Sequence, residues 1–179
     1  EVLVARCAVE PDFSVRDTLT WALTRHDPRA VLPRLEEQLS APGSQARSQA
    51  LHTLSKIADP GSWRLVAPGH RHDTDDEVAK AAWRAAVELV PEGEAIALAE
   101  DLGTELGVRE DPATQLSLSR PLAGLGEPGR AVAERIAGDS DGAAAQHARV
   151  TLAIIEDPDI GLEAALWEAR RRSVLGREP

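Results

Sequence analysis

Small apolar residues recur along this chain at intervals of 30 to 36 residues, and this repeat constrains the fold more than any other feature. Within each repeat the recurring positions lie four residues apart, so their side chains share one face of a helix. The first position is occupied in successive repeats by Val15, Ala46, Val78, Thr114 and Ala144. The period predicts an all-α superhelix, a solenoid whose repeats stack because none can bury its apolar face alone.

Five helix pairs and a final unpaired helix account for the repeat. Proline follows the second helix of most pairs, as at Asp27-Pro28 and Asp157-Pro158, where it ends one helix and can open the next. The predicted pairs are 1–9 with 12–26, 28–39 with 44–57, 61–66 with 75–90, 92–106 with 111–125, and 127–137 with 139–155. The last helix, 158–174, has arginines near its C-terminus that complement the helix dipole, so we expect it to cap the solenoid.

The size and composition fit one helical domain. Residues 1–179 are expected to form a single solenoid domain, since hydrophobic residues make up 42% of the chain. Aromatic residues make up only 3%, which predicts close helix packing over small side chains. Helix 1–9 carries no polar cap, although an end repeat needs one, so we expect the native protein to begin with a further repeat.

The charge balance narrows the range of partners. The chain has 30 acidic and 20 basic residues, a formal net charge of −10. Such a charge repels polyphosphates at long range, so we expect no nucleic-acid partner. No apolar run approaches the roughly 18 residues of a membrane span, so we expect no membrane contact and a soluble, cytoplasmic protein. The sequence does not indicate the oligomeric state.

Motifs for catalysis or metal binding do not support an enzyme. The chain has no Gly-rich phosphate loop, no His-Glu-x-x-His and no Gly-x-Ser-x-Gly. The lone Cys7 lies on an apolar helix face, where a buried, inert thiol is expected. His70, His72 and Asp73 could offer metal ligands, but their spacing suits one ion poorly, and a solvated turn is the better interpretation. We therefore expect a non-enzymatic protein without a metal or other cofactor.

Residues 44–60, Ser-Gln-Ala-Arg-Ser-Gln-Ala-Leu-His-Thr-Leu-Ser-Lys-Ile-Ala-Asp-Pro, resemble a HEAT repeat of the short bacterial kind that is also found in phycobilin-lyase-like proteins. The resemblance covers nearly the whole chain, and further stretches are similar to small stand-alone HEAT-repeat proteins of high-GC actinobacteria. In the HEAT family the second helix of each pair lines the concave face, which is the usual binding surface. The resemblance therefore implies that binding residues lie on the second helices.

Beyond their acidic first turns, the predicted second helices carry basic and aromatic residues that a core does not need. Arginine and tryptophan dominate binding hot spots, and a basic groove in an acidic protein suits an acidic segment of a protein partner. The candidate partner-binding residues are Arg16, Trp21, Arg47, His52, Lys80, Trp83, Arg84, Arg120 and Arg149. The alternative is structural: each arginine pairs with an acidic residue of its own or a neighbouring repeat. Trp63 and Trp167 lie elsewhere and are expected to pack.

The leading hypothesis is a protein-interaction scaffold or adaptor that binds its partner on the concave face. The second is a small-ligand or effector-sensing domain of a regulatory protein, because a solenoid groove with tryptophans can hold planar or anionic molecules. A chromophore lyase or a HEAT-type DNA glycosylase is suggested by analogy of fold alone. The glycosylase needs a strongly basic face, against which the net charge argues.

Overall fold

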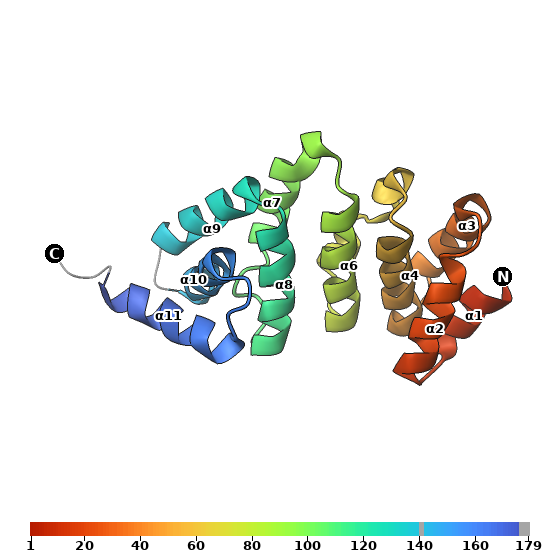
Figure 1. Ribbon diagram of the computed structural model, residues 1–179, viewed down its shortest axis with the longest axis horizontal. Helices are drawn as coiled ribbons and strands as arrows, with labels where there is room; N and C mark the ends of the chain where they lie inside the picture. The colour runs from red at the N-terminus through yellow and green to blue at the C-terminus, as the bar shows by residue number, and fades with distance from the viewer. Residues whose placement is uncertain (140–141, 176–179) are drawn as a thin grey trace. The chain divides into compact units, whose positions relative to one another are not determined.

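The computed structural model describes residues 1–139 and 142–175, and the regular elements in these ranges are all helical (Figure 1). The prediction of an all-α fold of packed helix pairs is therefore confirmed. The chain divides into two compact units, Glu1–Pro91 and Glu92–Pro179. None of the described helices is long and apolar enough to cross a lipid bilayer.

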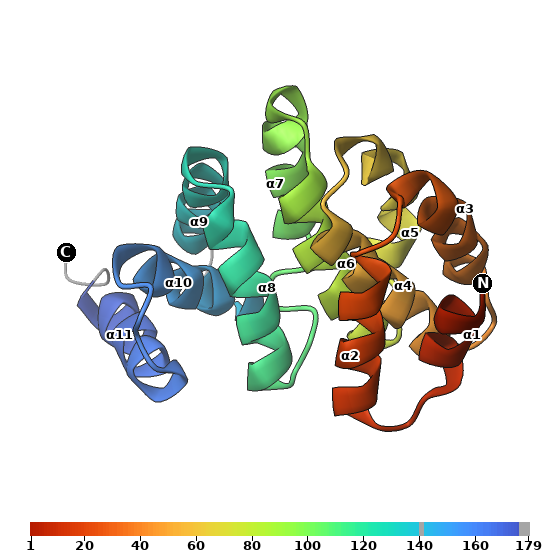
Figure 2. The same ribbon diagram turned by 45° about the vertical axis from the view of Figure 1, so that its right-hand side comes forward.

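The first unit contains three successive helical repeats. Helix α1 (Val2–Val9) packs on α2 (Phe13–Leu23), and α3 (Pro28–Leu39) packs on α4 (Ser44–Ile57). The second helices α2, α4 and α6 (Asp76–Leu89) lie side by side in sequence order (Figures 1 and 2). The binding face implied by the second helices is thus a continuous surface within this unit.

Aspartate caps explain why these helices begin where they do. Asp12 accepts hydrogen bonds from two backbone N–H groups in the first turn of α2, and Asp75 does the same for α6. At Asp27 and Asp59 the cap is followed by proline, whose missing N–H costs nothing at the first helical position. The Asp-Pro signal in the sequence is therefore a helix start.

The third repeat departs from the predicted helix over 61–66. A 3₁₀-helix η1 (Pro60–Leu65) and a single turn α5 (Pro68–Arg71) take its place. Prolines at both ends leave too few residues for a stable α-helix, because the residue before Pro68 is forced into an extended conformation. The connection to α6 is also more ordered than the expected solvated turn: the buried Arg71 donates through Nη1 to the Val66 carbonyl at 2.7 Å.

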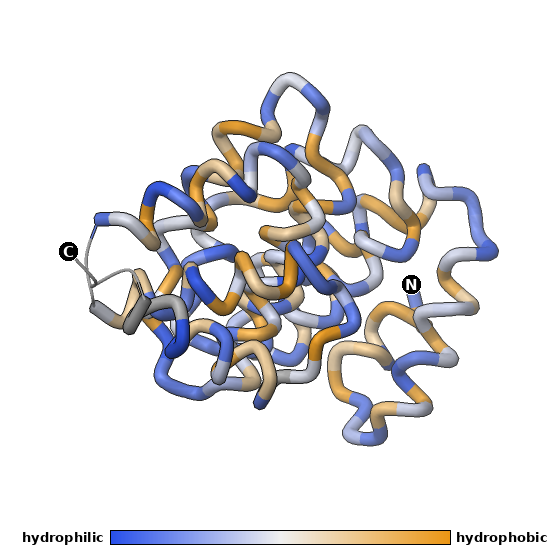
Figure 3. The backbone as a smooth tube through the Cα atoms, turned by 60° about the vertical axis from the view of Figure 1, so that its left-hand side comes forward, coloured by the Kyte–Doolittle hydropathy of each residue, from blue (hydrophilic) through white to orange (hydrophobic). Residues whose placement is uncertain are grey.

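The recurring apolar positions form the core of the first unit. Ala50, Leu54, Ala82 and Ala86 are buried where α4 packs on α6, and the small side chains of the three alanines allow close approach of the two helices. Figure 3 shows the hydrophobic and hydrophilic stretches that alternate along each helix as orange and blue segments. Val15 is an exception to the prediction and is exposed on α2, which packs mainly on α1 and α4.

The second unit is built from two further pairs and a last helix. Its elements are η2 (Glu92–Glu94), α7 (Ala95–Gly103), α8 (Pro112–Gly124), α9 (Glu127–Asp139), α10 (Ala143–Glu156) and α11 (Leu162–Leu175). Helix α11 packs on α10 and buries Ala165 and Ala169 against Val150 and Ile154, as expected of a terminal capping helix. Trp167 was expected to pack but is 64% exposed.

A buried polar network joins α8, α10 and the loop before α8. The Gly107 N–H donates to His147 Nδ1 at 3.0 Å, so the imidazole proton resides on Nε2, which donates to the Gln115 carbonyl at 3.0 Å. Ser119 Oγ lies 3.0 Å from the same nitrogen and accepts from Thr151 Oγ1. Each buried group thus has a partner while His147 is neutral.

The same register positions form a smaller network in the first unit. Gln49 Nε2 donates to Thr20 Oγ1 at 2.8 Å, and Thr53 Oγ1 donates to the Gln49 carbonyl at 2.8 Å. Gln49 and Thr53 occupy the positions in α4 that His147 and Thr151 occupy in α10, and Thr20 corresponds to Ser119. These polar contacts are therefore a recurring way of fixing neighbouring second helices in register.

We expect the second unit to lose stability in acid because of His147. Burial lowers the pKa of His147 to about 4. Protonation of Nδ1 would place two donors face to face at the Gly107 N–H. In the unfolded chain His147 has a pKa of about 6.5, so as the pH falls the unfolded state binds the proton before the folded state does. The contribution of His147 to the free energy of unfolding is therefore complete above that pH and falls by up to about 3 kcal/mol as the pH drops to about 4.

Urea denaturation of the protein at several pH values between these limits measures the effect. The change His147→Gln removes the titrating group. The part of the dependence of the free energy of unfolding on pH that is due to this residue should therefore disappear. His26→Gln, at an exposed histidine, is the control. A slope that persists unchanged in His147→Gln would contradict the assignment.

Candidate functional site

The predicted partner-binding residues fall into three groups by their environment. One group fixes the loop within its own helix pair. Arg16 donates through Nη1 to the carbonyls of Glu10 and Pro11 at 2.9 and 2.8 Å. Arg47 donates in the same way to the carbonyls of Ala41 and Pro42.

Gln115 occupies the same position in its second helix as Arg16 and Arg47, and it also donates to a loop carbonyl. Gln115 Nε2 donates to the Arg109 carbonyl at 2.7 Å. We call Arg16, Arg47 and Gln115 the loop latches, because each reaches back to a carbonyl five or six residues earlier. Arg47 also pairs with Asp73 at 3.1 Å, the kind of structural salt bridge that the alternative interpretation predicts. Arg47 therefore has a structural role.

Each residue of the second group has a hydrogen-bond or ion-pair partner within the protein. Trp83 is 0% exposed, and its Nε1 donates to the Arg71 carbonyl at 2.8 Å. The prediction that Trp83 contacts a partner is wrong, because α5 and the core of the first unit enclose the indole. Lys80 pairs with Glu77 at 3.0 Å, and Arg149 donates to the Ala137 carbonyl at 2.9 Å.

The third group faces solvent. Trp21 is 60% exposed, Arg84 and Arg120 are exposed, and His52 is half-buried. All four occupy one register position of their second helices, one residue after the position of Trp83. Within the described part of the chain, neither Arg84 nor Arg120 has an ion pair or a side-chain hydrogen bond. Their guanidinium groups are therefore available to a ligand.

In the first unit this exposed row borders a groove of about 260 Å³ across α2, α4 and α6. We call it the second-helix groove. Side chains that line it include Phe13, Arg16, Ser48, His52, Glu77 and Arg84. Phe13 and Trp21 lie eight residues apart on α2 and therefore share one face, on which Phe13 is 70% exposed and the Arg25 guanidinium lies 4.8 Å from the Trp21 ring centroid.

Positive charge surrounds His52 in this groove. Burial lowers the pKa of His52, and the nearby charges of Arg84, Lys56 and Arg16 lower it further against the opposing effect of Asp17. The His52 imidazole is therefore held neutral by a site that already carries cations.

The carboxylates of the groove have partners. A hydrogen bond from Ser44 is the largest cause that lowers the pKa of Asp75, which also accepts the N–H groups of Val78 and Glu77 as the cap of α6. Glu77 pairs with Lys80. Neither of these acids forms an ion pair with Arg84.

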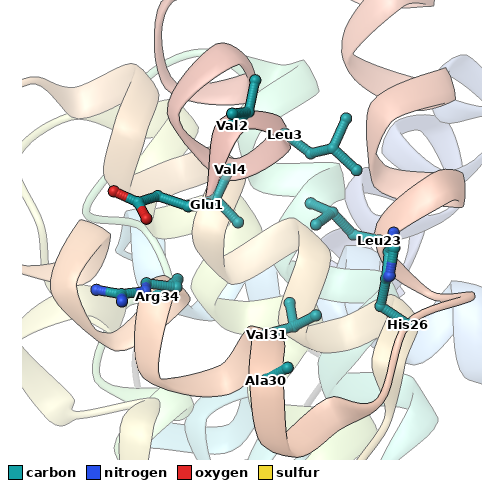
Figure 4. Close-up of a pocket in the computed structure, with 9 residues that line it drawn as sticks. All are labelled: Glu1, Val2, Leu3, Val4, Leu23, His26, Ala30, Val31 and Arg34. Atoms are coloured by element: carbon teal, nitrogen blue, oxygen red, sulfur yellow. The ribbon is translucent and has the colours of Figure 1, made fainter.

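Two further cavities are apolar. One of about 330 Å³ lies between α1, the end of α2 and α3, lined by Leu3, Leu23 and Val31, with Glu1 and Arg34 on one side (Figure 4). None of the predicted partner-binding residues lines it. The other, of about 540 Å³, lies between α8 and the end of α10 in the second unit. Its lining includes Ala123, Ile154, Ile155 and Pro158, with Arg120 and Asp159 as charged members.

Groups that could perform chemistry do not converge within the described residues. No three histidine, cysteine, aspartate or glutamate side chains there are arranged to hold a metal ion. Cys7 is buried, and burial raises the pKa of its thiol, which disfavours the reactive thiolate.

Three residues of the groove region were not predicted. Phe13, Arg25 and Lys56 contribute an exposed ring and two cations beside the predicted row. A signal for Phe13 is present in the sequence, since Phe13, Asp17 and Trp21 follow one another at the helical spacing of four residues. This spacing places a large aromatic side chain on the face that carries Trp21.

Comparison with known proteins agrees with this structure in the first unit. A search of curated proteins finds no match to the chain. The family model described as HEAT repeats matches residues 1–87, which end within α6 near the end of the first unit. The matched stretch contains α2, α4 and nearly all of α6, and with them the second-helix groove. The helix pairs of the first unit are thus similar to HEAT repeats over residues 1–87.

Proposed function

We propose that this protein is a non-enzymatic interaction scaffold that binds a protein partner on the second helices of its first unit. HEAT repeats typically serve as protein-interaction scaffolds and are usually not catalytic. The observation that carries the proposal is the exposed row of Trp21, His52 and Arg84 beside the second-helix groove. Exposed tryptophan and an unpaired arginine are the residue types that dominate binding energy at protein interfaces.

The environment of each candidate refines the proposed surface. Trp83 is excluded by burial, and Arg47 is engaged with a loop and with Asp73. The surface therefore consists of Phe13, Trp21, His52 and Arg84, with Arg16 at its edge. An acidic segment of the partner suits the surroundings of His52, where Arg84, Lys56 and Arg16 lower its pKa against the opposing effect of Asp17. The concave placement and the narrower likeness to actinobacterial HEAT proteins stay predictions.

Loss of the exposed side chains should abolish partner capture. The double change Trp21→Ala and Arg84→Ala removes two hot-spot side chains, each worth about 2 kcal/mol or more, so affinity should fall by about a thousandfold. Affinity purification from the native host with wild-type and variant bait, followed by titration of the captured partner, measures the loss.

The matched control is Arg29→Ala, which removes an exposed arginine from the first helix of its pair, α3. This variant should capture the same partners as wild type, and circular dichroism should show all baits equally helical. An unchanged set of partners for the double variant would contradict the proposed surface.

A ligand-sensing domain is a second candidate, favoured by the cavity of about 540 Å³ in the second unit. Its apolar lining and the unpaired Arg120 suit a small apolar molecule with an anionic group, and its volume lies in the usual range for such sites. We prefer the scaffold because Phe13 and Trp21 of the first unit expose large aromatic side chains beside an unpaired arginine, Arg84.

A further inference from the structure

We propose that the second-helix groove binds an acidic peptide segment by seating a carboxylate between Arg84 and His52, so that binding is coupled to proton uptake by His52. This inference rests on the function proposed above and adds the chemistry of the partner and a dependence on pH. It stands on the geometry of one groove, which His52 enters from α4 and Arg84 from α6.

The charges that face His52 come from all three helices of the groove. Helix α2 contributes Arg16 and Asp17, α4 contributes Lys56, and α6 contributes Arg84. Three cations therefore surround the imidazole against one carboxylate. An anionic side chain in the groove is attracted by this excess, whereas a cationic one is repelled.

The acidic residues of the protein itself do not occupy the space between Arg84 and His52. Asp75 lies at the N-terminus of α6, where Ser44 and two backbone N–H groups hold its carboxylate. Glu77 is paired with Lys80. Arg84 lies two turns further along α6, and no carboxylate among the described residues forms an ion pair with it.

A carboxylate bound beside His52 changes its protonation. In the free protein, burial and the neighbouring cations keep the pKa of His52 below its ordinary value. A bound carboxylate opposes those cations and favours the imidazolium, so the complex holds more protons than the free protein. Affinity must therefore rise as the pH falls through the pKa of His52 in the complex towards the lower pKa of the free protein. Arg84 supplies the constant part of the attraction and His52 the part that depends on pH.

A tryptophan-free probe tests the coupling on the whole chain. The probe is an N-acetylated, C-amidated peptide of eight glutamates, titrated by calorimetry in phosphate-free buffer at constant ionic strength. Between about pH 7.5 and about pH 5.5, where the probe stays ionised, wild type should bind it at least about fivefold more tightly at the lower pH. An octathymidylate is titrated in parallel.

Variants separate the two contributions. His52→Gln should still bind the peptide but with one affinity at both pH values, and Arg84→Ala should lose at least about tenfold at both. Arg29→Ala should behave as wild type. In addition, the peptide should raise the pKa of His52 measured from its imidazole NMR signals, and Arg84→Ala without peptide should raise it too, because a neighbouring cation is gone.

The inference is wrong if wild type does not bind the peptide, if its affinity is equal at the two pH values, or if His52→Gln keeps the wild-type dependence. Equal or tighter binding of octathymidylate would assign the groove to nucleic acid instead. The proposed function fails in a different experiment, when the variant lacking Trp21 and Arg84 side chains captures the same partners as wild type. A partner that requires Trp21 and Arg84 but binds equally at both pH values would leave the function standing and remove only the coupling.

Discussion

Replacing Trp83 by alanine should lower the free energy of unfolding of the first unit by about 3–5 kcal/mol. The indole is fully buried in α6, so its removal forfeits the packing of the largest side chain in this core and leaves a cavity. Its Nε1 also satisfies the carbonyl of the buried Arg71, which would lose that donor. Urea denaturation followed by circular dichroism measures the change without relying on tryptophan fluorescence.

Trp21→Ala is the matched control. It removes the same side chain from another second helix of the same unit, but Trp21 is mostly exposed and contacts chiefly the Arg25 guanidinium. This variant should lose less than about 1 kcal/mol. The two variants should therefore divide the roles: Trp83 supports the fold and Trp21 supports binding. Equal destabilisation by the two changes would contradict this division.

The second large effect is expected at Gly107 in the loop between α7 and α8. Its φ of +77° lies in the left-handed region, and a Cβ would lie 2.4 Å from the Ala144 backbone nitrogen in the first turn of α10. Gly107→Ala must therefore strain the backbone and push α10 away, which also disturbs the hydrogen bond from Gly107 to His147. We expect the second unit to lose about 3 kcal/mol or more in urea denaturation.

Gly126→Ala is the control that introduces backbone strain without a collision between the new Cβ and its surroundings. Gly126 has a similar φ of +67°, but a Cβ there would meet nothing within 4 Å. This variant should cost only about 1–2 kcal/mol, the price of the left-handed conformation alone. If both variants lose the same amount, close approach of the loop to α10 does not contribute to stability.

The sequence predicted helices best where side-chain periodicity and caps agree. The bounds 28–39 and 44–57 match α3 and α4, since a proline opens the first after an aspartate cap and a serine opens the second. The first helix of the third pair was wrong because Pro60 and Pro68 limit its length, which periodicity does not report. The spacing of apolar residues indicates which side of a helix is buried, whereas prolines limit the length of the helix.

The candidate site was harder to predict because adjacent residues on a helix differ by about 100° in direction. Trp83 and Arg84 belong to neighbouring rows, and the packing of α6 against α4 and α5 decides which row is buried. The contacts of Arg16 and Arg47 with loop carbonyls had no sequence signal. Their partners include backbone carbonyls, which every residue carries, so no pattern of residue types marks the contact.

The loop latches also set where the chain can change in length. Arg16 and Arg47 reach carbonyls at a fixed distance back along the chain, so an insertion between latch and carbonyl would break two hydrogen bonds and expose the loop to fraying. The corresponding residue of the third repeat is Ala79, which cannot reach back, and there the connection is longer and contains α5. Engineered insertions, such as a grafted epitope or a reporter peptide, should therefore be tolerated poorly between each latch and its carbonyls, in the connections before α2 and α4.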